Sequence, residues 1–231
     1  MLGSTSAAQR SHSAVAPAQL AAMAPQIRER AAGILDALPI GKATGAKLLP
    51  TLVSDASQIA SVSSQPISKW INHMLQVSDN TEAEMLARLI AIDQGYDGSF
   101  SSISAAFKQA LKITGLDTSA ITIRDGSGLS DLNSVSPMFM AKFMQLVNQG
   151  QGIFLNIKQA LPISAESGSL ADRFKGDNID AAGHIFAKTG WIKKGYTLAG
   201  IIQAKDSSQL VFAVYALGNV KSDAKLAIDN L

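Results

Sequence analysis

The stretch that decides the fold is Gly183-His184-Ile185-Phe186-Ala187-Lys188-Thr189-Gly190-Trp191. Small and apolar residues lead a β-type run up to one cation, one hydroxyl and one glycine. A second apolar run follows shortly after Lys193-Lys194, which predicts two neighbouring strands joined by a hairpin turn. The tripeptide Lys-Thr-Gly alone is weak evidence, because three common residues also recur in charged turns at strand ends, so other motifs must support a functional site.

A second polar triplet, Ser78-Asp79-Asn80, lies where a helix should break. Apolar residues at helical spacing follow Pro66, and a second helical pattern runs from Glu82 to Ile92. A helix, a polar triplet and another helix would project Ser78 and Asn80 from an elbow between packed helices. Asp79 or Asn80 could instead simply cap the second helix, and the two interpretations are compatible.

Several further segments make the pattern specific: Asp125-Gly126-Ser127-Gly128-Leu129-Ser130, Asn133, Val135-Ser136-Pro137, Leu161-Pro162-Ile163 and Gly168-Ser169-Leu170. Together with the two triplets, they resemble the D-alanyl-D-alanine carboxypeptidase/endopeptidase family of penicillin-binding type, which is S13-like. Ser-x-x-Lys, Ser-Asp-Asn and Lys-Thr-Gly form an established signature of penicillin-binding proteins and serine β-lactamases. The resemblance covers roughly residues 57–231 and corresponds to the C-terminal portion of that family.

The resemblance implies serine acyl transfer on peptidoglycan stem peptides that end in D-Ala-D-Ala. It also implies β-lactam binding. No cofactor is expected, and no metal site either, because the three histidines, His12, His73 and His184, have no metal-ligand spacing. Lys188 would supply positive potential at the edge of the active site. Ser78 would relay a proton toward the leaving amine, and Asn80 would hold the acyl side of the scissile peptide through its amide.

The same resemblance assigns three residues to substrate binding. Thr189 would hydrogen-bond the terminal carboxylate, and Gly190 would let the substrate lie along the strand as an added strand. The backbone N–H of Trp191 would be one of two donors to the oxyanion. Two positions depart from the family: Trp191 stands where Thr is usual, and Asp131 stands where a basic residue is common. These departures bear on specificity.

The nucleophile is the element that the motifs do not supply. In the family, Ser-x-x-Lys on a helix places the Lys amine beside the Ser hydroxyl as its activating base. The only such spacing is Ser222-Asp223-Ala224-Lys225, which follows Lys-Thr-Gly, whereas the family's nucleophile precedes the Ser-x-Asn triplet. We interpret this match as chance and therefore expect a C-terminal fragment that is inactive alone.

Two alternatives stay open. The chain could be a non-catalytic module that binds D-Ala-terminated peptides or a partner protein. It could also be one half of a split enzyme, completed by a separate chain that carries the Ser-x-x-Lys segment.

Composition narrows the class of protein. The 231 residues are 47% hydrophobic and 16% charged, with a net charge of +2 and no run of Lys or Arg longer than Lys193-Lys194, which argues against nucleic acid. There is no cysteine, and no apolar run reaches the ~20 residues of a membrane helix. We see no signal peptide, although the family implies an extracytoplasmic location, in the periplasm or cell wall.

The chain divides into three expected regions. Residues 1–25 should be disordered, and residues 26–56 should hold a helix and an irregular linker. Residues 57–231 should form the family domain, starting with a short β-like run at 57–64. Within it, helices are expected over 99–114, from Ser136-Pro137 onward, and over 151–160, with a short strand at Ile121-Thr122-Ile123.

The C-terminal region reads as β structure. Tyr196–Gln203 and Leu210–Leu217 are apolar runs joined by a polar connection, and a helix over 222–231 follows. Leu210–Tyr215 is apolar on both faces, which predicts an interior strand covered by helices. The expected fold class is α+β, a partial penicillin-binding/β-lactamase-like transpeptidase fold with three antiparallel strands. In the family, N-terminal strands would cover Leu210–Leu217, so the chain alone should expose a sticky edge and associate.

Overall fold

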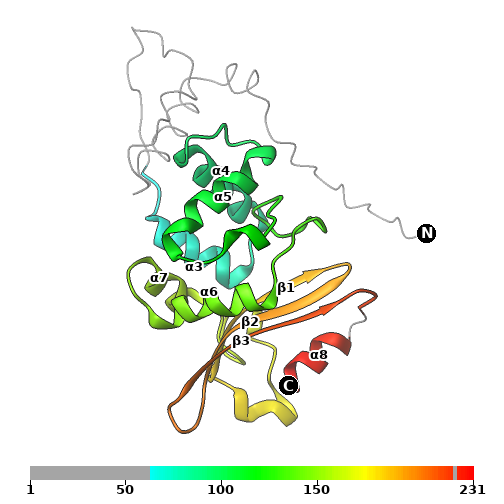
Figure 1. Cartoon of the computed structure of the whole chain (residues 1–231). Coiled ribbons are helices and arrows are strands. Elements are labelled where there is room, and N and C mark those ends of the chain that lie inside the picture. Colours follow the sequence, from blue (N-terminus) through cyan, green and yellow to red (C-terminus); the bar gives the residue numbers. More distant parts are fainter. Residues whose placement is uncertain (1–62, 221–222) are drawn as a thin grey trace, which may run out of the picture. The chain divides into compact units, whose positions relative to one another are not determined.

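Three antiparallel strands form the sheet, in the order β1 (Ile185–Ile192), β2 (Gly195–Gln203) and β3 (Gln209–Leu217) (Figure 1). The computed structural model describes residues 63–220 and 223–231, and every described element lies within the compact unit Gln65–Leu231. The β1–β2 register pairs Thr189 with Leu198 and Trp191 with Tyr196. Both hairpins and all three strands confirm the sequence-based prediction.

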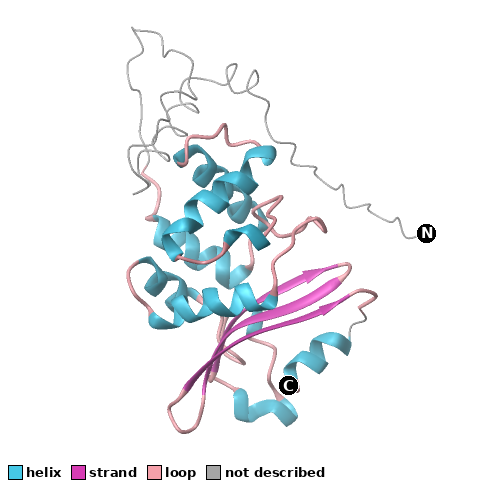
Figure 2. Cartoon of the chain, viewed as in Figure 1, coloured by secondary structure: helices cyan, strands magenta, loops and turns pink. Residues whose placement is uncertain are grey.

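Each face of the sheet is covered by helices, as Figure 2 shows. One face packs on α6 (Pro137–Gln149) and α7 (Ile153–Ala160), where Val147 and Ile201 are buried. The other face packs on α8 (Asp223–Asp229) and the 3-10 turns η4 (Gly168–Leu170) and η5 (Gly176–Ala181). Burial on both sides therefore fixes the orientation of β1.

A second group of helices lies beside this layer: α3 (Ile67–Val77), α4 (Asn80–Asp93) and α5 (Phe100–Ala110), which continues into η2 (Leu111–Thr114) (Figure 1). The predicted helices around the Ser-Asp-Asn triplet and over 99–114 are confirmed. α3 packs on α7, and the Gln76 side chain donates to the carbonyl of Ala160 at 3.0 Å. This contact ties the helix that leads into the triplet to the layer that carries the sheet.

The start of α6 follows the predicted capping chemistry. The Ser136 hydroxyl accepts a hydrogen bond from the backbone N–H of Phe139 at 3.1 Å, and Pro137 is the first helical residue. The helix ends at Gly150, which adopts φ +65°, a conformation that favours glycine.

Two expectations for the strands are wrong. The stretch Ile121-Thr122-Ile123 forms only one bridge, between Thr122 and Ser134, because the backbone of Arg124 bonds to the Asn133 side chain instead of to a partner strand; η3 (Thr118–Ala120) precedes it. β3 is an edge strand of the described sheet and not an interior one, and none of its residues is fully buried. Within the described residues, no strand pairs with the outer edge of β3, although its sequence is apolar on both faces.

The expectations for residues 1–25, for 26–56 and for the β-like run up to residue 62 lie outside the described residues. Ser63 and Ser64 have no regular secondary structure. The closing helix is described from Asp223 onward, and that part confirms the prediction. No helix among the described residues is long and apolar enough to cross a membrane.

Candidate active site

The Ser-Asp-Asn triplet forms the elbow between α3 and α4. Ser78 adopts the left-handed conformation (φ +58°, ψ +49°), which ends α3 and turns the chain. The Asp79 carboxylate caps α4 by accepting from the backbone N–H of Glu82 at 2.9 Å. Asn80 is the first residue of α4 and is exposed. Asp79 thus caps α4 while Ser78 lies at the elbow, and Asn80 projects from the first turn of α4 and not from the loop.

The outer edge of β1 is only partly occupied. Ala187 donates its backbone N–H to Pro162 at 3.0 Å, and the carbonyl of Ile185 accepts from Ser164 at 2.9 Å. Since backbone groups of alternate residues point to the same side of a strand, the N–H and C=O groups of Thr189 and Trp191 also point to this edge. Among the described residues, no backbone or side-chain acceptor binds the Trp191 N–H. The edge is therefore open where the Lys-Thr-Gly tripeptide ends.

The two triplets meet at this open edge. Lys188 Nζ lies 2.7 Å from Ser78 Oγ, and it also donates to the backbone carbonyl of Thr189 at 3.0 Å. A longer contact of 3.5 Å joins Lys188 Nζ to Thr189 Oγ1. The structure therefore brings together Ser78, Lys188 and Thr189. No hydrogen bond in the described part of the chain joins Asn80 to them.

A further hydroxyl belongs to the same group. Thr189 Oγ1 donates to Ser169 Oγ at 3.0 Å, and Ser169 lies on η4. The sequence pattern Gly168-Ser169-Leu170 was evident, but nothing in it indicated a contact with Thr189, which is 20 residues away. Ser169 thus joins this group of side chains, through a contact that the sequence pattern did not predict.

Lys188 supplies the charge of this group. Burial of its side chain lowers the pKa of Lys188 from 10.5 to about 8. The amine is therefore mostly protonated at neutral pH, yet it is close to the pH at which it can give up a proton. None of the ion pairs among residues 63–220 and 223–231 includes Lys188. The group presents a cation without an anionic partner there.

The Asp125–Asn133 segment is held by its own hydrogen bonds and by one to α4. The Asp125 carboxylate accepts from the backbone N–H groups of Gly128 and Ser130 at 2.6 and 2.7 Å. Gly126 donates to Glu84 of α4 at 2.7 Å. Gly128 adopts φ +78°, a conformation that favours glycine, whereas Gly126 is needed because an added Cβ would lie 2.4 Å from the Ala83 carbonyl oxygen.

The two residues that follow Lys188-Thr189 have neighbours on β2. An added Cβ at Gly190 would lie 2.3 Å from Thr197 Oγ1, so a side chain at this position would displace that of Thr197. The Trp191 ring stacks on Tyr196 with centroids 5.8 Å apart and is 72% exposed. Lys194 pairs with Asp131 at 3.2 Å, so the acidic departure at 131 faces a cation.

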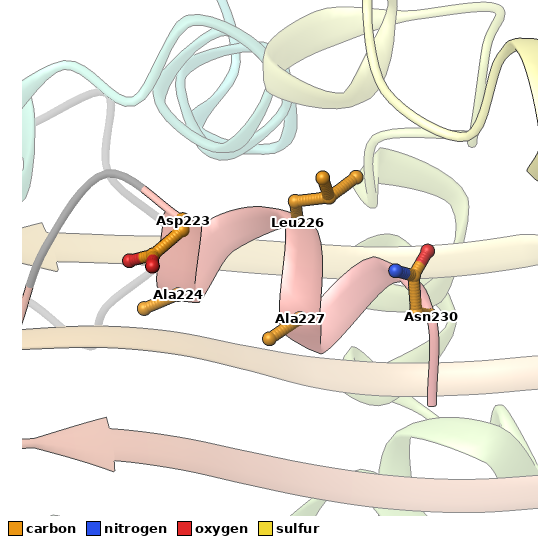
Figure 3. A pocket seen from close by; sticks show the side chains of 5 residues that line it. All are labelled: Asp223, Ala224, Leu226, Ala227 and Asn230. Carbon is orange, nitrogen blue, oxygen red and sulfur yellow. The ribbon is translucent and has the colours of Figure 1, made fainter.

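Two other features lie away from this group. Figure 3 shows a hollow on α8 lined by Asp223, Ala224, Leu226, Ala227 and Asn230, none of which is a predicted site residue. His73, Asp79 and Glu82 place one ligand atom each within 4.8 Å of one another, a grouping that the sequence spacing of the histidines did not indicate. Glu82 is hydrogen-bonded to His73 at 2.9 Å, and this hydrogen bond raises the pKa of the His73 imidazole. We therefore interpret the contact of His73 with Glu82 as an ion pair.

Comparisons with known proteins agree with the motifs. The sequence profile of the D-Ala-D-Ala carboxypeptidase 3 (S13) family matches residues 12–231. The chain is 31% identical over 207 residues to carboxypeptidase DacB of Mycolicibacterium smegmatis, which aligns 84% of this chain with 45% of that protein. It is 27% identical over 188 residues to D-alanyl-D-alanine carboxypeptidase DacB of Haemophilus influenzae, covering 79% of this chain and 39% of that protein.

The fold has solved counterparts. Penicillin binding protein 4 of Haemophilus influenzae, complexed with a β-lactam, superposes with a TM-score of 0.68 at 23% identity, covering 78% of this chain and 43% of that one. This similarity confirms the α+β fold class. The chain spans less than half the length of the curated relatives that it matches, at 45% and 39%.

Proposed function

The chain belongs to the D-Ala-D-Ala carboxypeptidase 3 (S13) family, and on that premise we propose that it carries the carboxylate-binding and proton-relay part of a serine-type D-Ala-D-Ala carboxypeptidase site. The observation that carries the proposal is the 2.7 Å contact between Lys188 Nζ and Ser78 Oγ. It joins the two family triplets, 110 residues apart, at an open strand edge. The substrate is a peptidoglycan stem peptide that ends in D-Ala-D-Ala.

Lys188 and Thr189 bind the terminal carboxylate of the substrate. Lys188 is a half-buried cation without an acidic partner among the described residues. Thr189 presents a hydroxyl beside it, with Lys188 Nζ 3.5 Å from Thr189 Oγ1. A fixed cation beside a hydroxyl-bearing side chain selects an anionic end over a continued peptide, which suits a carboxypeptidase.

The open edge of β1 receives the substrate backbone. Beyond Ala187 the outward backbone groups are those of Thr189 and Trp191, so a short peptide can add there as a strand. The Trp191 N–H then points at the reacting carbonyl as one of the two oxyanion donors. Removing such a donor typically costs ~3 kcal/mol of transition-state stabilisation.

Ser78 and Lys188 move the proton. As the scissile C–N bond breaks, Ser78 Oγ gives its proton to the departing amine of the terminal D-Ala and takes one from Lys188 Nζ, which donates to it in the structure. The lowered pKa of Lys188, about 8, makes this transfer easier than from an ordinary lysine. Asn80, on the other side of the elbow, holds the acyl portion through its amide.

The same site would bind β-lactams, because penicillins also carry a carboxylate beside an acyl carbonyl. The similar protein of Haemophilus influenzae was solved in complex with a β-lactam. Since peptidoglycan lies outside the cytoplasmic membrane, the proposed substrate places the protein in the periplasm or cell wall.

The nucleophile comes from a Ser-x-x-Lys segment other than Ser222–Lys225. Lys225 lies on α8, which packs on β2 and β3, whereas the proposed site is at the outer edge of β1. We therefore propose that this chain does not turn over substrate alone. Whether it is a fragment or one half of a split enzyme decides only which polypeptide supplies that segment, and a purely binding module is the remaining alternative.

Labelling with a fluorescent penicillin, followed by mass spectrometry of the labelled peptide, tests this proposal. The purified chain should carry no denaturation-resistant label. Adding a segment of a family relative that contains Ser-x-x-Lys should produce label on that segment, at a rate that falls with Lys188→Met. Covalent label on Ser222 or Ser78 of the chain alone would overturn the assignment of the nucleophile. No label in any mixture would favour a binding module.

A further inference from the structure

We propose that the hydroxyl group of Ser169 donates its proton to the substrate carboxylate, a role that the Gly168-Ser169-Leu170 pattern does not indicate. The inference rests on the proposed function, because it concerns the carboxylate end of the same substrate. Its basis is the contact of 3.0 Å between Thr189 Oγ1 and Ser169 Oγ. The two hydroxyls come from different elements, β1 and η4.

The hydrogen-bond directions leave one proton free in this pair. A serine hydroxyl has one donor proton and two acceptor lone pairs. Thr189 donates to Ser169, so Ser169 accepts that proton and keeps its own proton for another acceptor. No acceptor for the Ser169 hydroxyl is found among the described side chains, and both residues are partly exposed. A carboxylate, with two oxygens and only lone pairs, is the ligand that this arrangement suits.

The charge around the pair also favours an anion. The Lys188 ammonium group is close to this pair of hydroxyls, because Lys188 Nζ lies 3.5 Å from Thr189 Oγ1. No acidic side chain in the described part of the chain is hydrogen-bonded to Lys188, Thr189 or Ser169. A carboxylate can therefore contact the Lys188 cation and the free hydroxyl proton of Ser169, and no described acidic side chain is hydrogen-bonded to this group.

Ser169 is held in place on both sides. Gly168 has φ +56°, and an added Cβ there would lie 2.8 Å from the backbone oxygen of Gln76, so the turn packs tightly on α3. Leu170 is fully buried beneath the sheet, and its carbonyl accepts from Ala165 at 3.0 Å. The hydroxyl between these two anchors is thus fixed relative to both α3 and β1, as a preorganised donor needs to be.

The test compares two ligands, diacetyl-L-Lys-D-Ala-D-Ala and its C-terminal amide, by calorimetric titration of the whole chain. A hydrogen bond to a charged group predicts that Ser169→Ala weakens binding of the acid by roughly tenfold. Binding of the amide should change by less than about twofold, since it presents no anion. Ser169→Thr keeps the hydroxyl and should restore the preference for the acid.

Ser167→Ala is the matched control. Ser167 is on the same loop, and its hydroxyl accepts from Ile163 at 3.1 Å, so its loss perturbs the loop without removing a donor from the site. The acid-to-amide affinity ratio should stay at the wild-type value in this variant. A ratio that falls equally in Ser167→Ala and Ser169→Ala would overturn the inference and indicate a structural role.

The outcomes separate the inference from the proposed function. If wild-type protein does not prefer the acid over the amide, the proposed carboxylate site is wrong and the inference with it. If wild-type protein prefers the acid and Ser169→Ala does so to the same extent, only the inference is wrong. Thermal unfolding verifies that Ser169→Ala is folded; if it is not, Ser169→Cys, with its weak S–H donor, replaces it and should show the same loss.

Discussion

Lys188 Nζ and Ser78 Oγ lie 2.7 Å apart, although 110 residues separate them in the chain. This contact joins the middle of strand β1 to the elbow between α3 and α4. Each residue is placed by its own element: β1 by burial on both faces, and the elbow by the Asp79 cap. The predictions below follow from this arrangement and from the packing that maintains it.

Binding of a C-terminal carboxylate should weaken as the pH rises through about 8, where Lys188 loses its proton. The neutral amine no longer attracts the anion. Calorimetric titration with diacetyl-L-Lys-D-Ala-D-Ala between pH 6 and 10 measures this change. Lys188→Met should bind weakly at every pH, and a wild-type affinity that does not depend on pH would contradict the assignment.

The free energy of unfolding should rise with pH where Lys188 loses its proton, whereas carboxylate binding weakens there. Its pKa is about 8 when folded, against an ordinary value of 10.5. Between these values the unfolded chain binds more protons than the folded one, so the free energy of unfolding rises with pH. Urea unfolding measures the free energy of unfolding of wild type and of Lys188→Met. The value for wild type minus that for Lys188→Met should rise from pH 8 to 10.5 and stay constant below pH 8.

Gly126→Ala should destabilise the protein through a steric clash. The added methyl group would lie 2.4 Å from the Ala83 carbonyl oxygen and 2.5 Å from the Ala87 Cβ atom. Overpacking of this kind typically costs about 1–3 kcal/mol. Gly128→Ala is the control, because it has open space and only the cost of φ +78°, about 1 kcal/mol. Urea unfolding should rank Gly126→Ala as the more destabilising change.

The buried Arg173–Asp229 ion pair should anchor α8. Both side chains are under 9% exposed, at 6% and 8%, and Arg173 Nε donates to Asp229 Oδ2 at 3.1 Å. Asp229→Ala leaves the guanidinium buried without its partner, which typically costs ~3–5 kcal/mol. The double variant Arg173→Met/Asp229→Leu should lose less than Asp229→Ala. Equal losses in the two proteins would show that the charge is not the cause.

The outer edge of β3 should make the purified chain associate. β3 is apolar, and no strand pairs with its outer edge among the described residues. The backbone N–H of Ala213 points outward by alternation with its neighbours, whereas that of Val214 faces β2. Analytical ultracentrifugation should show self-association that Ala213→Pro reduces, while Val214→Pro should unfold the hairpin. A monomeric wild-type chain with a single cooperative transition would refute this prediction.

Much of the local structure could be predicted from the sequence, because it depends on neighbouring residues. Ser136-Pro137 predicted the start of α6, and the polar triplet predicted the break between α3 and α4. Polar segments between apolar runs marked the two hairpins. The family motifs also singled out Ser78, Lys188 and Thr189, and the structure places Lys188 in contact with the other two.

The remainder depends on contacts between distant segments. The contact of Ser169 with Thr189 arises because Leu170 is buried beneath the sheet, which no local pattern shows. The need for glycine at 126 comes from the approach of α4, not from its own backbone angles. The apolar pattern of β3 correctly indicates a strand that favours burial, but its position in the sheet is set by its pairing, and the structure places it at the edge.

The most direct measurement of the central claim is an amide-resolved NMR titration of the chain with diacetyl-L-Lys-D-Ala-D-Ala. The account predicts that the largest shifts occur at Thr189, Trp191, Ser78 and Ser169, and that Lys188→Met abolishes them. Shifts centred on the hollow of α8, around Asp223 and Asn230 (Figure 3), or shifts that persist in Lys188→Met, would contradict a carboxylate site at the edge of β1.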